Sequence, residues 1–293
     1  MHDFEYEAPT SVADAVELLA KHNGTARILA GGTDLIDQIR TGRFAPDVVI
    51  DIKKLDALHR IDMSSDGLSL GAVVPCYRIY GDETICRDYS ALADATKIIG
   101  GAQIQSRASV GGNLCNSGPA ADSTPALISL GAKAVIAGPD GIREVPVENF
   151  CTGPGKNVLQ PGELLTELAM PSRPAHSGSH YLRFIPRNEM DIAVVGVGAS
   201  VVLDDSGEKI VSARIALGAV AATPLFAEEA SELLAGRPVG DEAIEAAMAA
   251  TRKIATPIDD MRGTVEFRKH VTGVLTRRSL EKAIERARAN TGS

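Results

Sequence analysis

Two segments that carry paired glycines contain the residue types best suited to binding an anion. They are Ala30-Gly31-Gly32-Thr33-Asp34-Leu35 and Ala108-Ser109-Val110-Gly111-Gly112-Asn113-Leu114. Each follows an apolar run that predicts a β-strand. Because glycine tolerates unusual φ angles and has no side chain, such a segment can direct consecutive backbone N–H groups at one oxyanion. A tight turn is the simplest interpretation of either pair alone, whereas two pairs from separate segments predict a clamp on a pyrophosphate.

The composition excludes several classes of protein. The chain has 293 residues, enough for two or three domains, and its net charge of −8 argues against nucleic-acid binding as its main task. The absence of tryptophan and an aromatic content of 4% also disfavour a base-stacking surface. No apolar stretch reaches the roughly 18 residues of a membrane span, and the first residues lack the pattern of a signal peptide. We therefore expect a cytoplasmic protein without a membrane span.

The residues that most often bind metals are poorly arranged for that task. No C-x-x-C pair is present, so we expect free thiols and neither an iron–sulfur cluster nor a structural zinc on this chain. His176 and His180 are spaced i, i+4 but lie in a Ser/Gly-rich segment, which predicts exposed side chains rather than ligands. No local set of residues indicates a catalytic acid, base or nucleophile. The sequence contains four widely spaced cysteines, Cys76, Cys86, Cys115 and Cys151.

The first fifty residues predict a compact β-α-β-like unit around the first glycine pair. A helix over 10–22 is followed by a strand over 27–30, a helix over 33–40 with Thr33 or Asp34 as its cap, and a buried strand over 47–52. The glycine pair then lies between a strand and a helix N-terminus. Anions bind there because unpaired N–H groups and the helix dipole point the same way.

The remainder predicts an antiparallel, α+β arrangement. We expect hairpins over 60–74 and 132–147, helices over 75–99 and 123–130, and a strand over 164–170. A Pro, Ser and Gly cluster at 171–179 predicts a linker. Strands at 181–184, 192–203 and 210–220 and helices at 224–235, 241–254 and 265–288 follow it. Gly196-Val197-Gly198 lacks both the third glycine and the following helix of a Rossmann fingerprint.

Several motifs, in order, resemble one family. The chain is similar to the FAD-binding medium subunit of the molybdenum hydroxylases, the xanthine dehydrogenase and carbon monoxide dehydrogenase superfamily, over essentially its whole length. The resemblance rests on AGGTDL at 30–35, SVGGNLCNSGPAADS at 109–123, GPGK at 153–156, LQPGELL at 159–165, RNEMDIA at 187–193 and the C-terminal stretch from 266 to 278.

The resemblance implies a fold and its division into domains. The family fold is a vanillyl-alcohol-oxidase (PCMH) type FAD-binding domain of two α+β subdomains, followed by a C-terminal antiparallel sheet with helices. On this chain the FAD-binding domain would cover 1–175, with subdomains of about 1–56 and 57–175. The C-terminal flavoprotein domain would cover 178–290.

The same resemblance implies which residues hold the FAD diphosphate. Asp122 would accept a hydrogen bond from a ribityl or ribose hydroxyl, and Leu164 or Leu165 would touch the adenine side. The first glycine segment would contact the diphosphate and ribityl chain through Leu29, Ala30, Gly31, Gly32, Thr33, Asp34 and Leu35. The second would contact the other side of the diphosphate through Ser109, Val110, Gly111, Gly112 and Asn113.

Three further residues would lie around the flavin ring. Ile192 would flank the isoalloxazine, at a position where some relatives carry tyrosine. Arg183 falls where relatives often have lysine near the ring. Ile99 occupies the position of an aromatic residue in xanthine dehydrogenases, so this chain departs from their pattern.

The implied function is that of a flavoprotein oxidoreductase subunit. The chain would hold FAD and pass electrons from [2Fe–2S] clusters on a small partner subunit to an external acceptor, while a large subunit with a molybdenum–pterin cofactor oxidises the substrate. The expected assembly is a dimer of such heterotrimers. The alternatives are a stand-alone FAD-dependent oxidase or dehydrogenase on the same scaffold and a flavin-free binding or assembly protein.

Overall fold

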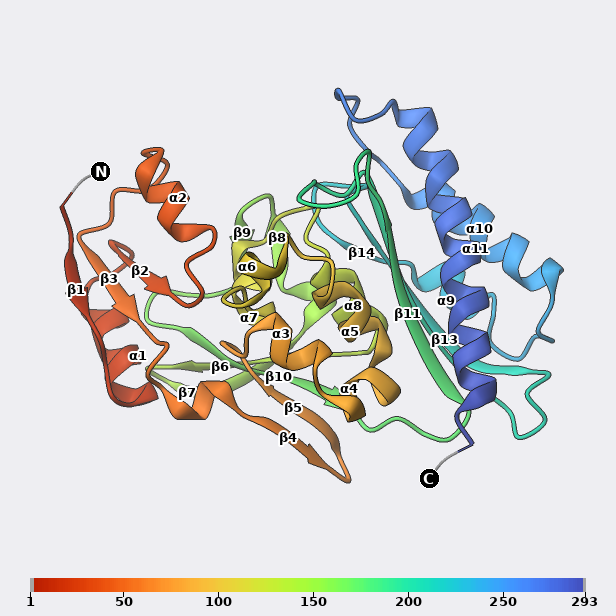
Figure 1. The fold of residues 1–293 in the computed structure, drawn as a ribbon, viewed down its shortest axis with the longest axis horizontal. Helices are drawn as coiled ribbons and strands as arrows, with labels where there is room; N and C mark the ends of the chain where they lie inside the picture. Colours follow the sequence, from red (N-terminus) through yellow and green to blue (C-terminus); the bar gives the residue numbers. More distant parts are fainter. Residues whose placement is uncertain (1–2, 292–293) are drawn as a thin grey trace.

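Three larger β-sheets, each with its own helices, follow one another along the long axis of the molecule. The structure is a computed structural model that describes residues 3–291. In Figure 1 the N-terminal strands lie at one end and the long helix α11 (Val265–Ala289) lies at the other. We refer to the three parts as the N-terminal, middle and C-terminal units, each defined by its sheet. The order of the units along the chain is therefore also their order in space.

The N-terminal unit is a small parallel sheet with strand order β1-β3-β2 and two helices. Helix α1 begins where the Ser11 side chain accepts a hydrogen bond from the Asp14 amide at 3.1 Å, and it buries Ala15 and Leu19 against the sheet. The expected β-α-β-like unit is confirmed. Its elements are β1 (Glu5–Glu7), α1 (Val12–Lys21), β2 (Ala26–Leu29), α2 (Leu35–Arg40) and β3 (Val48–Asp51).

The middle unit is a five-stranded antiparallel sheet, order β4-β5-β10-β6-β7, covered by short helices. Both expected hairpins are present, as β4-β5 and β6-β7, and β10 lies between them. The strands are β4 (Ile61–Ser64), β5 (Gly67–Gly71), β6 (Lys133–Gly138), β7 (Gly141–Pro146) and β10 (Leu164–Pro171). The remaining elements are η1 (Asp56–His59), α3 (Cys76–Tyr80), α4 (Glu83–Asp88), α5 (Ser90–Thr96), α6 (Ala102–Gln105), α7 (Val110–Asn116), α8 (Ser123–Ser129), η2 (Val147–Asn149), β8 (Cys151–Gly153) and β9 (Lys156–Asn157).

The approach to the second glycine pair is helical, so the expected strand before it is wrong. Gln105 fixes the helical turn of α6, because its side chain donates to the Lys97 carbonyl at 2.8 Å and accepts from the Tyr80 hydroxyl at 3.0 Å. Ser109 then caps α7, accepting from the Gly112 amide at 3.1 Å. The second glycine pair therefore lies in the first turn of a helix, whereas the first pair lies in a loop before one.

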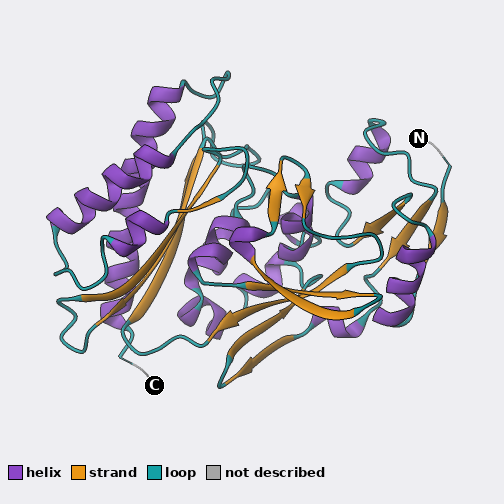
Figure 2. Ribbon diagram, turned by 180° about the vertical axis from the view of Figure 1, so that it is seen from behind, coloured by secondary structure: helices purple, strands orange, loops and turns teal. Residues whose placement is uncertain are grey.

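The C-terminal unit is a four-stranded antiparallel sheet, order β11-β12-β13-β14. Figure 2 shows helices on both of its faces, and α11 packs on one face while α5 and α8 of the middle unit pack on the other. Strand β11 begins at Ser177, so the expected linker is shorter than 171–179. The expected helix over 224–235 is shorter than predicted, because a short strand takes the place of its first turn. The elements are β11 (Ser177–Phe184), β12 (Val195–Leu203), β13 (Ile210–Gly218), β14 (Leu225–Phe226), α9 (Glu228–Glu232), α10 (Asp241–Ile254) and α11.

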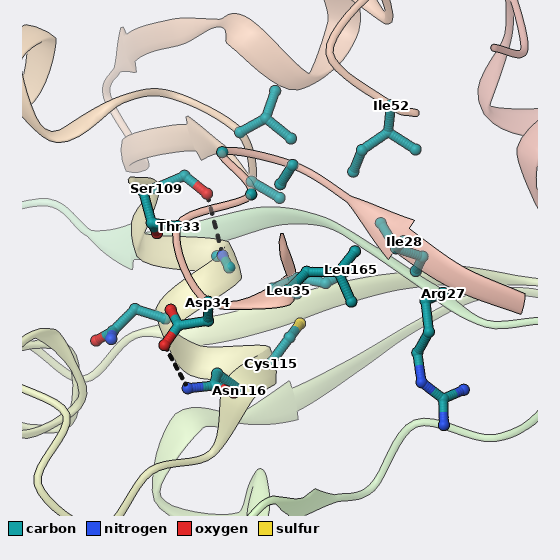
Figure 3. A pocket seen from close by; sticks show the side chains of 18 of the residues that line it. Arg27, Ile28, Thr33, Asp34, Leu35, Ile52, Ser109, Cys115, Asn116 and Leu165 are labelled. Carbon is teal, nitrogen blue, oxygen red and sulfur yellow. Dashed lines mark hydrogen bonds between the residues drawn. The ribbon is translucent and has the colours of Figure 1, made fainter. Parts of the chain in front are cut away.

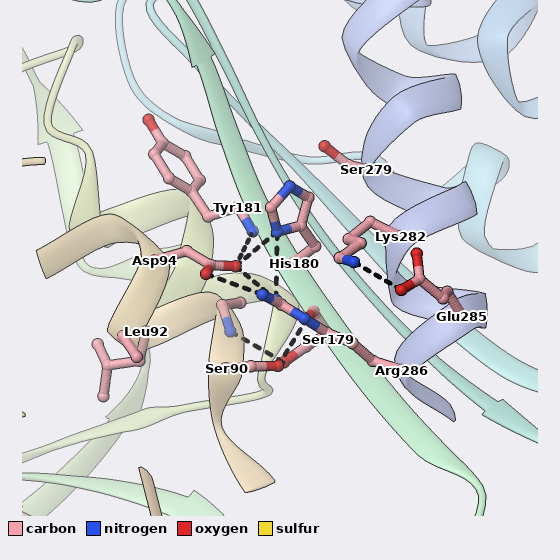
Figure 4. A network of polar contacts seen from close by, with 12 residues as sticks. Ser90, Leu92, Asp94, Ser179, His180, Tyr181, Ser279, Lys282, Glu285 and Arg286 are labelled. Atoms are coloured by element: carbon pink, nitrogen blue, oxygen red, sulfur yellow. Dashed lines mark hydrogen bonds and ion pairs between the residues drawn. The ribbon is translucent and has the colours of Figure 1, made fainter. Parts of the chain in front are cut away.

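Asp94 of α5 joins the middle unit to the C-terminal unit (Figure 4). Its carboxylate accepts hydrogen bonds from both Nη atoms of Arg286 on α11, at 2.6 and 3.0 Å. Its Oδ2 also lies 2.5 Å from Nδ1 of His180 on β11. Burial raises the pKa of Asp94, but the hydrogen bonds from His180 and Arg286 outweigh it and hold the pKa below its usual value. The expectation that His180 is an exposed linker residue is therefore wrong.

No helix in 3–291 combines the length and the apolar character needed to cross a membrane. Within the same residues, no cluster of three or more His, Cys, Asp and Glu side chains could hold a metal ion.

Candidate cofactor site

A cavity of about 620 Å³ lies between the N-terminal and middle units, and both glycine segments line it (Figure 3). Strand β2 and the loop before α2 supply one wall. Helix α7 and strand β10 supply the other, so the two walls come from segments that are far apart in the sequence. The structure thus places the two glycine segments in one site, whereas their residue types alone showed only that the segments are similar.

Polar contacts hold the two glycine segments against each other. Arg107 Nε, just before the second segment, donates to the Gly31 carbonyl at 3.0 Å. Farther along, the Asn116 side chain donates to Asp34 Oδ1 at 3.3 Å and accepts from Gln38 Nε2 at 3.0 Å. These bonds fix the spacing between the loop before α2 and helix α7. The cavity is therefore a built cleft rather than a gap between independent units.

The four positions require glycine for different physical reasons. Gly31 packs directly on the Arg107 carbonyl and Gly111 on the Ala72 backbone, so a Cβ at either position would collide with main chain. Gly32 has a φ of +78°, which side-chain-bearing residues rarely adopt. A Cβ on Gly112 would meet only Ser109 Oγ at 3.0 Å and the Ala30 Cβ at 3.9 Å, in the space between the segments. Gly112 is thus the glycine whose missing side chain leaves room for a ligand.

Unpaired backbone amides make the cavity suitable for an anion. Within the described residues, the amides of Gly31, Gly32, Thr33 and Asp34 donate to no protein acceptor, and neither does that of Gly111. Buried or half-buried N–H groups normally have partners, so such a row indicates a place for a ligand acceptor. These donors belong to the backbone and carry no net charge. An acidic protein can therefore use them to bind phosphate without a cluster of basic side chains.

The rest of the lining is largely apolar. Ile28 of β2, Ile52 beyond β3 and the pair Leu164 and Leu165 of β10 form one part of the wall, and Ile99 contributes another. A cofactor with a diphosphate and two flat ring systems requires N–H donors together with apolar walls. The residues of this cavity fit FAD by that criterion.

Most of the expected FAD contacts line the cavity, and five do not. Those that line it are Ala30, Gly31, Gly32, Thr33, Asp34, Leu35, Ile99, Ser109, Gly111, Gly112, Asn113, Leu164 and Leu165. Those outside the lining are Leu29, Val110, Asp122, Arg183 and Ile192. Ile192 is 54% exposed, which is unusual for a large apolar side chain.

Asp122 and Arg183 form a buried ion pair beside the cavity. Arg183 Nη1 donates to Asp122 Oδ2 at 2.6 Å, and the Tyr181 hydroxyl donates to Oδ1 at 2.8 Å. Arg183 also donates to the Ile98 carbonyl at 2.8 Å, next to the cavity residue Ile99. Burial raises the pKa of Asp122, and although Arg183 and Tyr181 counteract this effect, the pKa stands at about 6.

Several lining residues were not expected from the sequence. Gln38, Arg43 and Phe44 follow the first glycine segment on and just beyond α2, and Arg27 lies on β2. Asn157 comes from β9 and donates to the Cys115 carbonyl at 2.8 Å. They lie near the 30–35 and 153–156 motifs, but residues of this kind are common on ordinary surfaces, so their types alone did not mark them as cofactor contacts.

Two family models together match nearly the whole chain. Residues 2–173 match the model described as "FAD binding domain in molybdopterin dehydrogenase". Residues 180–283 match the model described as "CO dehydrogenase flavoprotein C-terminal domain".

Known proteins with similar sequences and folds are chains of dehydrogenases. The carbon monoxide dehydrogenase medium chain of Afipia carboxidovorans is 34% identical over 97% of this chain and 98% of its own length. The xanthine dehydrogenase FAD-binding subunit of Escherichia coli O157:H7 is 33% identical over 98% of both chains. A chain in the structure of reconstituted CO dehydrogenase from Oligotropha carboxidovorans superposes with a TM-score of 0.92 at 33% identity, covering 97% of this chain and 98% of that one. These similarities confirm the expected α+β FAD-binding fold.

The buried Asp122 predicts a pH dependence of stability. Its carboxyl pKa of about 6 lies above the ordinary 3.8, so between these pH values the folded chain retains a proton that the unfolded chain releases. The stabilisation is complete below about pH 4 and is lost as the pH rises through 6. For a shift of this size the loss amounts to about 3 kcal/mol in the free energy of unfolding.

Urea denaturation of the wild type and Asp122→Asn at several pH values between 4 and 7 measures this effect. The variant cannot titrate at position 122, so its stability lacks this pH-dependent contribution. The free energy of unfolding of the wild type minus that of the variant should therefore fall as the pH rises from 4 to 7. A difference that stays constant over this range would contradict the raised pKa.

Proposed function

Because this chain belongs to the family of FAD-binding subunits of molybdenum hydroxylases, we propose that it is the electron-transfer subunit of such an enzyme. The observation that carries the proposal is the cavity between two glycine segments in a chain that matches flavoprotein relatives from end to end. FAD bound there would accept electrons from [2Fe–2S] clusters of a partner subunit and deliver them to an external acceptor.

The residues of this chain would bind and orient the cofactor. The unpaired amides of Gly31, Gly32, Thr33 and Asp34 would hold the diphosphate from one side, and α7 with Gly112 would hold it from the other. Leu164 and Leu165 would shield the adenine end from water. Ile192 and Ile99 are proposed to flank the flavin ring, and their apolar side chains would exclude water from it. Leu29, Val110, Asp122 and Arg183 remain proposed contacts.

The proposed partners are a small [2Fe–2S] subunit and a large molybdenum–pterin subunit, in a dimer of heterotrimers. The relatives support a division of labour, because one is named for carbon monoxide and another for xanthine although both are similar to this chain from end to end. Substrate oxidation would then reside on the large partner.

The domain division of 1–175, with subdomains of about 1–56 and 57–175, and of 178–290 is also a proposal. Three hydrophobic clusters support it, each lying mainly in one unit. A cytoplasmic location is proposed because the four cysteines are free thiols, as is usual in a reducing compartment.

Purification of the chain from its native cells under non-denaturing conditions tests the proposed function. We expect the chain to co-purify with two other polypeptides and with FAD, iron and molybdenum in fixed proportions. Mass spectrometry of the complex and metal analysis provide the readout. A yellow, catalytically active chain that purifies alone and free of both metals would instead support the stand-alone oxidase or dehydrogenase.

Replacement of Gly112 by valine tests the role of the glycine segments in FAD binding. The new side chain would enter the space between the segments, so we expect FAD affinity to fall by about 3 kcal/mol, or ~100-fold, in a chain that still folds. Flavin fluorescence titration of the apoprotein measures the affinity, and circular dichroism confirms the fold.

Gly240→Val is the matched control, because Gly240 lies far along the chain, has an extended φ of 178° and has no atoms near its missing side chain. It should bind FAD like the wild type. Gly31 and Gly111 are unsuitable for this test, since their substitution would disturb the backbone contacts of the fold. Wild-type affinity in Gly112→Val would refute a ligand site between the segments.

A further inference from the structure

We propose that Arg43 is a phosphate-binding residue that closes over the cavity and pairs with the diphosphate of FAD. The proposal rests on FAD binding by this chain and assigns phosphate to the second of two arginines in the cavity lining, since the first, Arg27, is held by backbone carbonyls. It is carried by the position of Arg43, by the residues that hold it, and by its lack of a hydrogen-bond or ion-pair partner within residues 3–291.

A tight turn after α2 places Arg43 and Phe44 at the cavity. The amides of both residues donate to the carbonyl of Gln38, at 2.9 and 3.2 Å, and Gly42 with a φ of +76° permits the turn. Gln38, Arg43 and Phe44 all line the cavity. The backbone therefore fixes the starting point of the Arg43 side chain at the edge of the site.

An aromatic ring flanked by two guanidinium groups supports this edge. The guanidinium carbon of Arg27 lies 4.6 Å from the centre of the Phe44 ring, and that of Arg43 lies 5.6 Å from it. Arg27 is itself anchored, because its Nη1 donates to the carbonyls of Gly24 and Ala26 at 2.9 Å each. Arg27 thus positions Phe44, and Phe44 supports Arg43.

The Arg43 side chain reaches from the N-terminal unit to the middle unit. Its Nη2 lies 3.1 Å from the point where a Cβ on Gly155 would stand, in the turn between β8 and β9. Gly155 is fixed there, because its amide donates to the Ser117 carbonyl at 3.0 Å. A cofactor held between the two glycine segments would therefore lie in the cleft that Arg43 crosses.

Arg43 is exposed at the edge of the cavity, and its guanidinium has no hydrogen-bond or ion-pair partner within residues 3–291, so its N–H donors are free to bind a ligand. The other arginines beside the site are engaged, Arg107 by the Gly31 carbonyl and Arg183 by Asp122. Asp34 interacts with Arg43 only at longer range. Desolvation in the cavity raises the pKa of Asp34, and the charge of Arg43 opposes that rise.

A diphosphate is the ligand that this arrangement fits. The planar guanidinium presents five N–H donors in a fork that matches phosphate oxygens. The amides of the glycine segments supply hydrogen bonds without net charge, and Nη1 of Arg27 is already bonded to backbone carbonyls. Arg43 supplies a positive charge with free N–H donors from the open side of the cavity.

Titration of the full-length apoprotein with FAD and with riboflavin, which has no phosphate, tests this assignment. For Arg43→Ala we expect FAD affinity to fall about 10- to 100-fold, as for loss of a charge-assisted hydrogen bond, and riboflavin affinity to stay at the wild-type value. Wild-type FAD affinity should weaken between about 50 and 500 mM NaCl, and that dependence should be smaller in Arg43→Ala. Arg43→Lys should recover part of the affinity.

Arg40→Ala is the matched control, since Arg40 is an exposed residue of α2 outside the cavity lining, and it should bind FAD like the wild type. FAD affinity of Arg43→Ala within twofold of the wild type would overturn the proposal. Equal losses for FAD and riboflavin would also overturn it, because they would assign Arg43 to the shape of the cavity instead of to phosphate. Failure of the wild type to bind FAD would overturn the FAD assignment itself.

Discussion

The contact between Gly31 and the carbonyl of Arg107 is the constraint on which the site depends. A side chain at position 31 would occupy the place of that carbonyl, so the N-terminal and middle units can approach this closely only with glycine there. The contact is reinforced by the hydrogen bond from Arg107 to the Gly31 carbonyl. Gly111 fulfils the same requirement against Ala72 on the other wall. These two glycines build the cleft, Gly32 permits the positive φ of the first segment, and Gly112 leaves the cleft open.

Charge is distributed around the cleft in a consistent way. Near the glycine segments the donors are backbone amides, and the carboxylate of Asp34 is held by Asn116. Asp122 is neutralised by Arg183 and Tyr181 in a buried cluster beside Ile98. Arg43 is left as a cation at the opening. An acidic protein can therefore bind a dianionic diphosphate without a basic surface patch.

The sequence predicts much of the fold because its local patterns are strong. The β-α-β-like unit, both hairpins of the middle sheet and helices α10 and α11 follow from apolar periodicity and from turn residues. The helix before the second glycine pair could not be predicted in this way, because Gln105 fixes it through partners at positions 80 and 97. The pairing of His180 with Asp94 and Arg286 depends on contacts up to 192 positions apart, which no local pattern encodes.

The site is predictable from the sequence to a similar extent. The glycine motifs predict that their own residues contact the cofactor, and most of these residues line the cavity. Arg27, Arg43 and Phe44 could not be foreseen, because an arginine becomes informative only when its surroundings show whether it has a partner. Asp122 is identified by its motif, but its burial against Tyr181 and Arg183 appears only when β11 is placed beside α8.

The central claim is that one FAD diphosphate lies between the two glycine segments. A crystal structure of the chain with FAD bound tests it most directly. We predict phosphate oxygens within hydrogen-bond distance of backbone amides in both Gly31–Asp34 and the first turn of α7. A diphosphate that contacts only one of these segments, or that lies outside the cavity they share, would contradict the account.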